Sequence, residues 1–410
     1  MANSVNRVFD AHVQRNLLRL EGQIADLSAR QVTLRLHSEL LAAINFGLGR
    51  VTTILLAASL MSAAAKIILR QAQWHEWLPL YQKACAIKTI PDHLRVQLHN
   101  QLGVLYQHLG QFDIAAKAHE QAIAIAKAIG VPDGLAKSYV HRASVACAQM
   151  NLDTAQTYCE NALAISTNTL TENSRAFTRQ IEGKIAFLKG EYDVAIKHFA
   201  PYIISQIQAE NLYDALAIMN DKGIAHTRLQ QPLAALKTYD QALEIADQIG
   251  NPVEHIRIAL NKSYLYLSLG ASEEALTALQ KIDSVFLRNS ADIVQQGTVA
   301  HNIGYALHKL GRQNEALIHF DRAQRTWLRL NHSLYLANTL GDAARANLAL
   351  GRHQLGCLQL DQSIQLLKSC SEDAWAEDIL QQNQVLLHRM RDEQGTEGGD
   401  ISPLQKQITN

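Results

Sequence analysis

The sequence has little proline, few aromatic residues and no excess of charge of either sign. Only seven prolines occur in 410 residues, the first at Pro79, so long stretches of chain contain nothing that would interrupt a helix. Aromatic residues make up 6%, and runs of the β-branched residues that favour strands are scarce. Apolar residues still reach 48%, mostly as alanine and leucine. This composition predicts an all-α protein whose helices approach one another through small residues.

The balanced charge argues against a nucleic-acid partner. Lys+Arg and Asp+Glu number 38 each, whereas a protein that neutralises many phosphates carries a basic excess. Residues 40–56 can be aligned with a helix-turn-helix, but the segment that would read the DNA is nearly uncharged. We therefore expect no nucleic-acid binding.

Motifs for disulfides, metals and catalysis are also missing from the sequence. The five cysteines are scattered and form no CxxC pair, which indicates reduced residues without metal or disulfide roles. No complete phosphate-binding loop, zinc-protease helix or G-x-S-x-G motif occurs, so we expect neither enzyme activity nor a cofactor. The N-terminus carries charges where a signal peptide needs an apolar core, which predicts a cytoplasmic protein. Residues 51–65 are uncharged but shorter than the ~20 residues of a membrane helix, and we expect a buried helix there.

An internal repeat of 40 or 41 residues organises most of the chain. A small residue recurs at Gly103, Ala143, Gly183, Gly223, Ser263, Gly304 and Ala344. A second small residue follows it at Ala115, Ala155, Ala195, Ala235, Ala275, Ala316 and Gly356. Four residues later stands a residue that is aromatic or apolar in most copies: His119, Cys159, Phe199, Tyr239, Leu279, Phe320 and Leu360. Such a unit is a pair of helices that cannot bury its apolar face alone, so the copies must stack.

The order of small residue, aromatic, turn glycine, alanine, aromatic and alanine resembles the tetratricopeptide repeat family. The usual period of that family is 34 residues, and the longer form seen in this sequence is similar to the repeats of kinesin light chains and of bacterial sensor and peptide-receptor domains. The resemblance covers about residues 58–390. It implies an all-α fold, a right-handed α-solenoid of antiparallel helix pairs.

Three segments are expected along the chain. Residues 1–50 form an N-terminal helical segment, and residues 51–390 form the solenoid. The solenoid comprises a divergent repeat at 58–90, seven repeats at 96–371 and a capping helix at 372–390. Residues 391–410 are polar and glycine-rich, which predicts a disordered tail.

The N-terminal segment carries a narrow apolar seam, and its role has two interpretations. The seam consists of Val13, Leu17, Leu20, Ile24 and Leu27. It can pack onto the solenoid as a helical cap. Alternatively, it can form a homodimer through residues 5–46, or act as an effector module.

The resemblance also implies where a ligand binds. In the family the first helix of each pair lines the concave face, and the corresponding positions can be read from this sequence. They predict a site made by Asn100, His141, Lys184, Asn220, Arg228, Arg257, Asn261, Tyr264, His301, Asn302, Tyr305 and Arg345. Six cations on this face, including Lys137 and Lys309, are set against two anions, Asp221 and Asp342, so we expect a positive surface. Asparagine amides can pair with any peptide backbone, which favours an extended, somewhat acidic peptide or a chain terminus as ligand.

Three functions follow from this interpretation. The first is a non-enzymatic scaffold or adaptor that binds a protein or peptide segment on the concave face. The second is a peptide-responsive receptor whose N-terminal helices act as effector. The third is a regulatory subunit of a membrane or nucleic-acid complex. The sequence names neither the partner nor the pathway.

Overall fold

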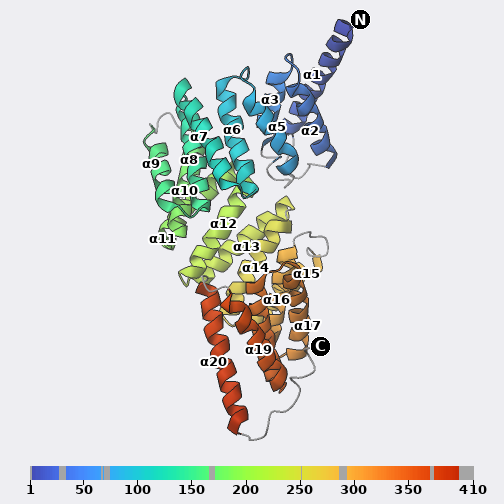
Figure 1. Ribbon diagram of the computed structural model, residues 1–410. Coiled ribbons are helices and arrows are strands. Elements are labelled where there is room, and N and C mark those ends of the chain that lie inside the picture. The colour runs from blue at the N-terminus through green and yellow to red at the C-terminus, as the bar shows by residue number, and fades with distance from the viewer. Residues whose placement is uncertain are drawn as a thin grey trace. The chain divides into compact units, whose positions relative to one another are not determined.

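The computed structural model describes residues 2–26, 34–65, 68, 74–165, 171–250, 252–285, 293–369 and 374–396. Throughout these residues the regular structure is α-helix, and most helices pack against the next helix of the chain (Figure 1). The predicted fold class, an all-α solenoid of antiparallel helix pairs, is confirmed.

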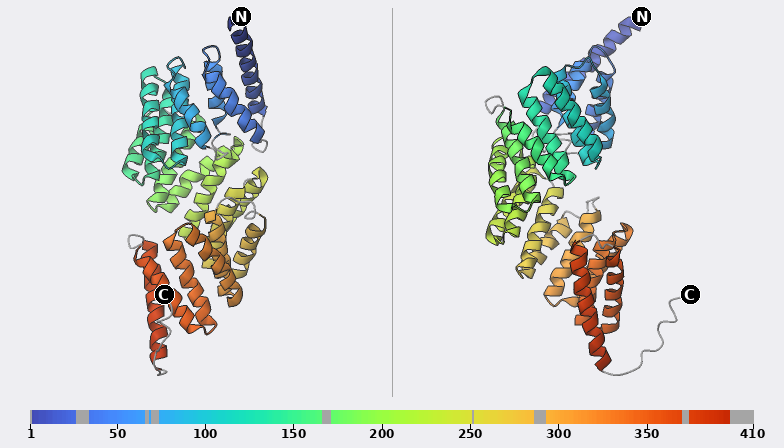
Figure 2. Two further views of the ribbon diagram at one scale, coloured as in Figure 1. Left: turned by 45° about the vertical axis from the view of Figure 1, so that its right-hand side comes forward. Right: turned by 60° about the vertical axis from the view of Figure 1, so that its left-hand side comes forward.

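The chain divides into two compact units, residues 1–250 and 251–410, where a single solenoid was expected. The helices of unit 1 are α1 (Ala2–Asp26), α2 (Leu34–Leu48), α3 (Ile54–Ala63), α5 (Trp74–Ala86), α6 (Asp92–His108), α7 (Phe112–Ile129), α8 (Pro132–Ala148), α9 (Leu152–Leu163), α10 (Glu172–Leu188), α11 (Tyr192–Gln208), α12 (Leu212–Arg228) and α13 (Pro232–Ile249). Those of unit 2 are α14 (Pro252–Ser268), α15 (Ser272–Val285), α16 (Ile293–Lys309), α17 (Gln313–Arg329), α18 (Ser333–Ala349), α19 (His353–Lys368) and α20 (Ala374–Thr396). Both views in Figure 2 show the helices of each unit side by side in chain order.

The small residue of each repeat lies where two helices meet. A Cβ added to Gly223 would lie 2.3 Å from the Tyr239 ring, and one added to Gly304 would lie 2.8 Å from the Phe320 ring. Only glycine therefore lets the first helix of the pair rest on the aromatic ring of the second. The six alanines from Ala115 to Ala316 in the second series, and the aromatic or apolar residue that follows each, are fully or almost fully buried. The residues that recur in the sequence are thus the core residues of the helix pairs.

The turn inside each pair needs a left-handed residue. Five repeats place glycine there, for example Gly190 with φ 81° and Gly311 with φ 78°. Two repeats instead place Met150 and Gln230 in the same conformation, with φ 57° and 55°. The geometry of the turn is therefore kept even where the favourable residue is absent.

The N-terminal seam packs within its own chain. Val13, Leu17 and Leu20 of α1 are buried in a cluster that also contains Ile44 of α2 and Leu60 of α3. A Cβ on Gly47 would lie 2.6 Å from Ala57, so α2 and α3 touch closely. The interpretation of the seam as a cap agrees with this burial, and the boundary expected at residue 50 runs through the cluster. Leu27, the last residue of the seam, lies outside the described residues.

The apolar stretch at 51–65 contributes α3, whose Ala57, Ala58, Leu60 and Met61 are buried. No helix in the described part of the chain is long and apolar enough to cross a membrane. The expectation of a buried helix at this position is met.

Helix α20 covers the last repeat, as a capping helix should. Ala376 and Ile379 pack with Leu367 of α19, and Leu387 packs with Leu360 and Ile364. The helix continues past the expected end at Met390 to Thr396. The remainder of the predicted tail lies outside the described residues.

Candidate peptide-binding pocket

A cavity of about 740 Å³ lies in unit 2, lined by the first helices α14, α16 and α18, by Trp327 of α17 and by α20. The lining residues on α14 include Arg257, Asn261, Tyr264 and Ser268, and those on α16 include Thr298, His301, Asn302 and Tyr305. Helix α18 contributes Tyr335, Asn338 and Asp342, and α20 contributes Trp375, Asp378, Ile379 and Gln382. Spacings of three and four residues place each set on one face of its helix. The 40-residue repeat then brings three such faces next to one another.

His301 is held at the pocket by hydrogen bonds from both ring nitrogens. Asn338 Nδ2 lies 3.3 Å from His301 Nε2, and the hydroxyl of Thr339 lies 3.0 Å from Nδ1. Nε2 also lies 3.5 Å from a carboxylate oxygen of Asp342, and the tautomer of the ring sets which nitrogen donates. Burial lowers the pKa of His301, and the carboxylate of Asp342 opposes this shift. His301 is therefore neutral at physiological pH and fixes the neighbouring amide and hydroxyl.

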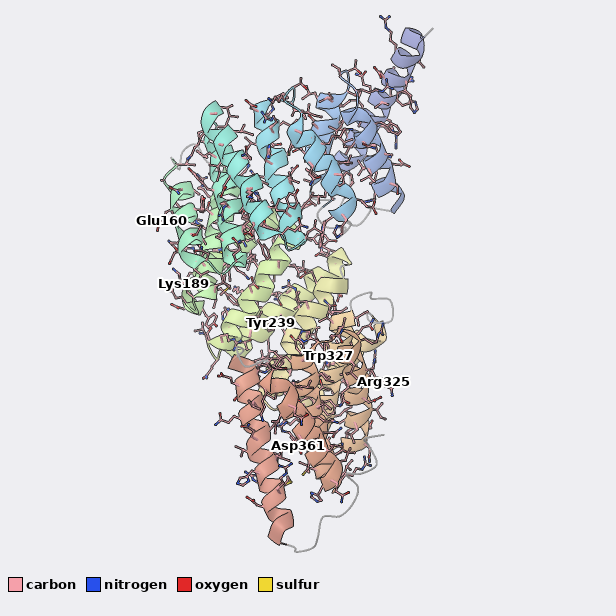
Figure 3. The ribbon with its side chains drawn as sticks, viewed as in Figure 1. Glu160, Lys189, Tyr239, Arg325, Trp327 and Asp361 are labelled. Carbon is pink, nitrogen blue, oxygen red and sulfur yellow. The ribbon has the colours of Figure 1, made fainter. Side chains whose placement is uncertain are left out.

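Aromatic rings form one end of the pocket. Trp327 stacks on Tyr335 with ring centroids 4.9 Å apart, and the Tyr335 ring meets Trp375 edge to face at 5.6 Å. Trp327 is only 1% exposed, and its indole lies against Gly297, where a Cβ would be 2.7 Å from the ring. Figure 3 labels Trp327 among the helices of unit 2. Arg325, from the same helix, lies toward the edge of that unit in this view. In the described part of the chain the Trp327 Nε1 proton has no hydrogen-bond acceptor.

The structure brings six of the predicted site residues together at this pocket: Arg257, Asn261, Tyr264, His301, Asn302 and Tyr305. Tyr264 is 62% exposed, so its ring is available to a ligand. Arg345 lies instead in an adjoining hollow with Gln382 and Arg389, where its Nη2 donates to Asn383 Oδ1 at 2.9 Å.

The predicted residues of unit 1 have a different environment. Asn100 is buried, donating to Ser138 Oγ at 2.8 Å and lying 3.1 Å from His119 Nδ1, and Asn220 is buried as well. The His141 ring stacks on His119 with centroids 5.3 Å apart. Lys184 pairs with Asp221 at 2.8 Å, and Arg228 is exposed. Asn100 and Asn220 are buried inside the repeat core, so neither side-chain amide is exposed to solvent.

Four of the six cations that suggested a positive surface have a carboxylate partner, and the sign of the surface stays a prediction. Lys137 pairs with Asp133 at 2.8 Å and Lys184 with Asp221. Arg257 Nε donates to Glu254 at 3.0 Å, and Arg345 lies 3.4 Å from Asp342. A carboxylate three or four residues away on the same helix, or on the next first helix, neutralises each of the four.

Several pocket residues were missed by sequence reasoning, among them Trp327, Tyr335, Asn338, Trp375 and Asp378. Trp375 and Asp378 lie on α20, which the repeat pattern identifies only as a cap. Trp327 lies on the second helix of its pair, where the family pattern places core residues. No sequence signal marks them, because aromatic residues are no more frequent between 327 and 375 than in the chain as a whole.

Comparison with known proteins agrees with this geometry. Residues 100–129, which span most of α6 and all of α7, match a family model described as "Tetratricopeptide repeat". The chain carries tetratricopeptide repeats. A photosystem I assembly protein, Ycf3, of Parasynechococcus marenigrum (strain WH8102) is 28% identical over 139 residues, which is 33% of this chain and 74% of that protein.

Three solved structures resemble the fold of this chain. The apo form of RapI has a TM-score of 0.55 at 13% identity, covering 88% of this chain and 98% of its own. A Rap protein complexed with Competence and Sporulation Factor has a TM-score of 0.52 at 14% identity, with 88% and 99% covered. The apo quorum sensor NprR from B. thuringiensis has a TM-score of 0.53 at 14% identity, with 70% and 82% covered. At these identities the likeness shows the fold alone.

Proposed function

We propose that the pocket of unit 2 binds an extended peptide or protein segment, which makes the chain a non-enzymatic interaction protein. The observation that carries this proposal is the alignment of Asn261, Asn302 and Asn338 on three successive first helices around one cavity. A side-chain amide offers both a donor and an acceptor, so three in a row can pair with the backbone of an extended peptide whatever its sequence.

The rest of the pocket suits the same ligand. The exposed ring of Tyr264 offers apolar contact area with a polar tip. A protein-interaction role fits the tetratricopeptide repeat. One of the similar structures, the Rap protein, holds Competence and Sporulation Factor. The cytoplasm remains the proposed location.

The test is capture of partners from native extract by wild type and by an Asn261→Ala, Asn302→Ala variant, with mass spectrometry of what is retained. Removing two amides should weaken a peptide complex roughly tenfold or more, because each lost hydrogen bond contributes about 0.5–1.5 kcal/mol. Asn314→Ala is the matched control, since Asn314 is an exposed residue of α17 that does not line the pocket. If all three proteins retain the same partners equally, the pocket is not the binding site.

A second candidate is a receptor in which peptide binding in the pocket changes what α1–α3 contact. The resemblance of the fold to NprR, a quorum sensor, favours it. A receptor should become more compact when ligand is added, whereas an adaptor should change little, and small-angle scattering with and without the captured peptide separates the two.

A further inference from the structure

The charge of the pocket differs from that of its surroundings. Asp342 and Asp378 both line it, and Arg257 is the cation among the described lining residues. Arg257 is bonded to Glu254, and Asp342 lies 3.4 Å from Arg345. Within the described residues Asp378 has no cationic partner, and its one hydrogen bond comes from Gln382 Nε2 at 2.9 Å. His301 adds no charge, because burial keeps it neutral. Asp378 is therefore the lining carboxylate that no described cation neutralises.

The adjoining hollow has the opposite sign. It is lined by Arg345 and Arg389 and shares Gln382 with the pocket. A ligand that spans both would accordingly meet carboxylates at the aromatic end and guanidinium groups beyond it.

Aromatic faces lie next to the unpaired carboxylate. Trp375, three residues before Asp378 on α20, is 41% exposed and meets Tyr335 at an angle of 61°. The Tyr305 ring is different, because Lys309 Nζ already lies 5.1 Å from its centroid. The exposed surface of Trp375 faces solvent next to Asp378, and indole is the most favourable ring for contact with a cation.

We propose that the Trp375 end of the pocket selects a peptide with a cationic side chain, arginine or lysine. The side chain lies on the exposed Trp375 ring, beside Tyr335, with its charge at Asp378. This inference rests on the proposed function of the pocket as a peptide site.

The experiment uses the full chain and fluorescein-labelled five-residue peptide mixtures in which only the central residue is set, to Arg, Lys, Gln or Glu. Binding is measured by fluorescence polarisation at physiological salt. We expect the Arg and Lys mixtures to bind about tenfold more tightly than the Gln mixture, the size of a partly desolvated cation–π contact combined with a carboxylate. The Glu mixture should bind most weakly.

Two variants locate the preference. Asp378→Asn and Trp375→Ala should each reduce the difference between Arg and Gln several-fold, with thermal unfolding confirming that both remain folded. Asp361→Asn is the matched control, because Asp361 lies on α19 outside the pocket lining (Figure 3). It should retain the full preference.

The outcomes separate this inference from the proposed function. If mixtures bind, and lose affinity in the Asn261→Ala, Asn302→Ala variant, but show no preference for Arg or Lys, the cation site is wrong and the peptide site stands. A preference that survives both Asp378→Asn and Trp375→Ala also overturns the cation site. If no mixture binds, both proposals fail.

Discussion

At the scale of single residues, the least expected feature is a histidine in the core of a repeat. His119 occupies the position that Phe199, Tyr239 and Phe320 fill in other copies, and it is fully buried beneath Gly103. Its Nδ1 lies 3.1 Å from the side-chain oxygen of Asn100, so a hydrogen bond fixes the ring in addition to packing. A side chain that can take up a proton near neutral pH therefore stands where the other copies have none.

This histidine predicts that the fold weakens in acid. Burial lowers the pKa of His119 well below its usual value, with His141, Arg142 and His99 adding to the shift. The unfolded chain takes up a proton below about pH 6.5 while the folded protein does not, so stability falls as pH drops through that value. Between pH 7.5 and 5 we expect His119 alone to remove roughly 1–2 kcal/mol from the free energy of unfolding.

Urea unfolding at the two pH values checks the prediction. His119→Phe should lose less stability than wild type on acidification, since phenylalanine occurs at the same position in two other repeats. At either pH the variant leaves the Asn100 oxygen without its donor, a cost that does not depend on pH. His388→Gln is the control, because the His388 side chain is 80% exposed. Equal pH dependence in His119→Phe and wild type would contradict the assignment.

At the scale of elements, the repeats differ mainly in how well their turns suit the backbone. The first helices all span 17 residues, and the left-handed residue comes two positions after each of them. Where that residue is glycine the conformation carries no steric cost, whereas Met150 and Gln230 adopt it against the preference of an L-residue.

Gln230→Gly should therefore stabilise the turn between α12 and α13. Gln230 is exposed with φ 55°, so relief of backbone strain outweighs the loss of its side chain, by up to about 1 kcal/mol. The next residue supplies the control: Gln231 has φ −107°, which any residue adopts, and Gln231→Gly should destabilise. Chemical denaturation of the three proteins measures both effects, and a loss of stability in Gln230→Gly would show that the left-handed conformation costs little here.

At the scale of the whole molecule, the stabilising contacts are mostly between helices that are neighbours in the chain. Packing joins each helix mainly to its neighbours in the chain, and the contacts cluster into two units that divide at Gly250. A stack of this kind has a stability close to the sum of its pairs and their interfaces, without one core to enforce a single transition.

Thermal unfolding should accordingly depart from two-state behaviour. Scanning calorimetry is expected to give a van't Hoff enthalpy clearly below the calorimetric enthalpy, because the two units need not melt together. At a urea concentration where about half of the helical signal is lost, the amides that remain protected from hydrogen exchange should be concentrated in one unit. A ratio of one between the two enthalpies would show that the units unfold as a single body.

Much of this architecture could be predicted from the sequence because it repeats. Gly223 and Tyr239, sixteen residues apart, recur as Gly304 and Phe320, and a contact that recurs at a regular period is visible as a pattern. The same regularity located six of the residues around the unit 2 pocket, since helix spacing alone puts Asn261 and Tyr264 on one face.

Tertiary structure decided the features that do not repeat. The charge of the pocket depends on Asp378 from α20 and on the pairing of Arg257 with Glu254, and neither follows from position in the repeat. Burial of Asn100 depends on His119 and Ser138, which come from different helices. Periodicity thus determined which faces the helices present, because it follows from the geometry of one helix. Which side chains remain available and what charge they leave depended on contacts between helices, because ion pairs and hydrogen bonds form wherever packing brings two groups together.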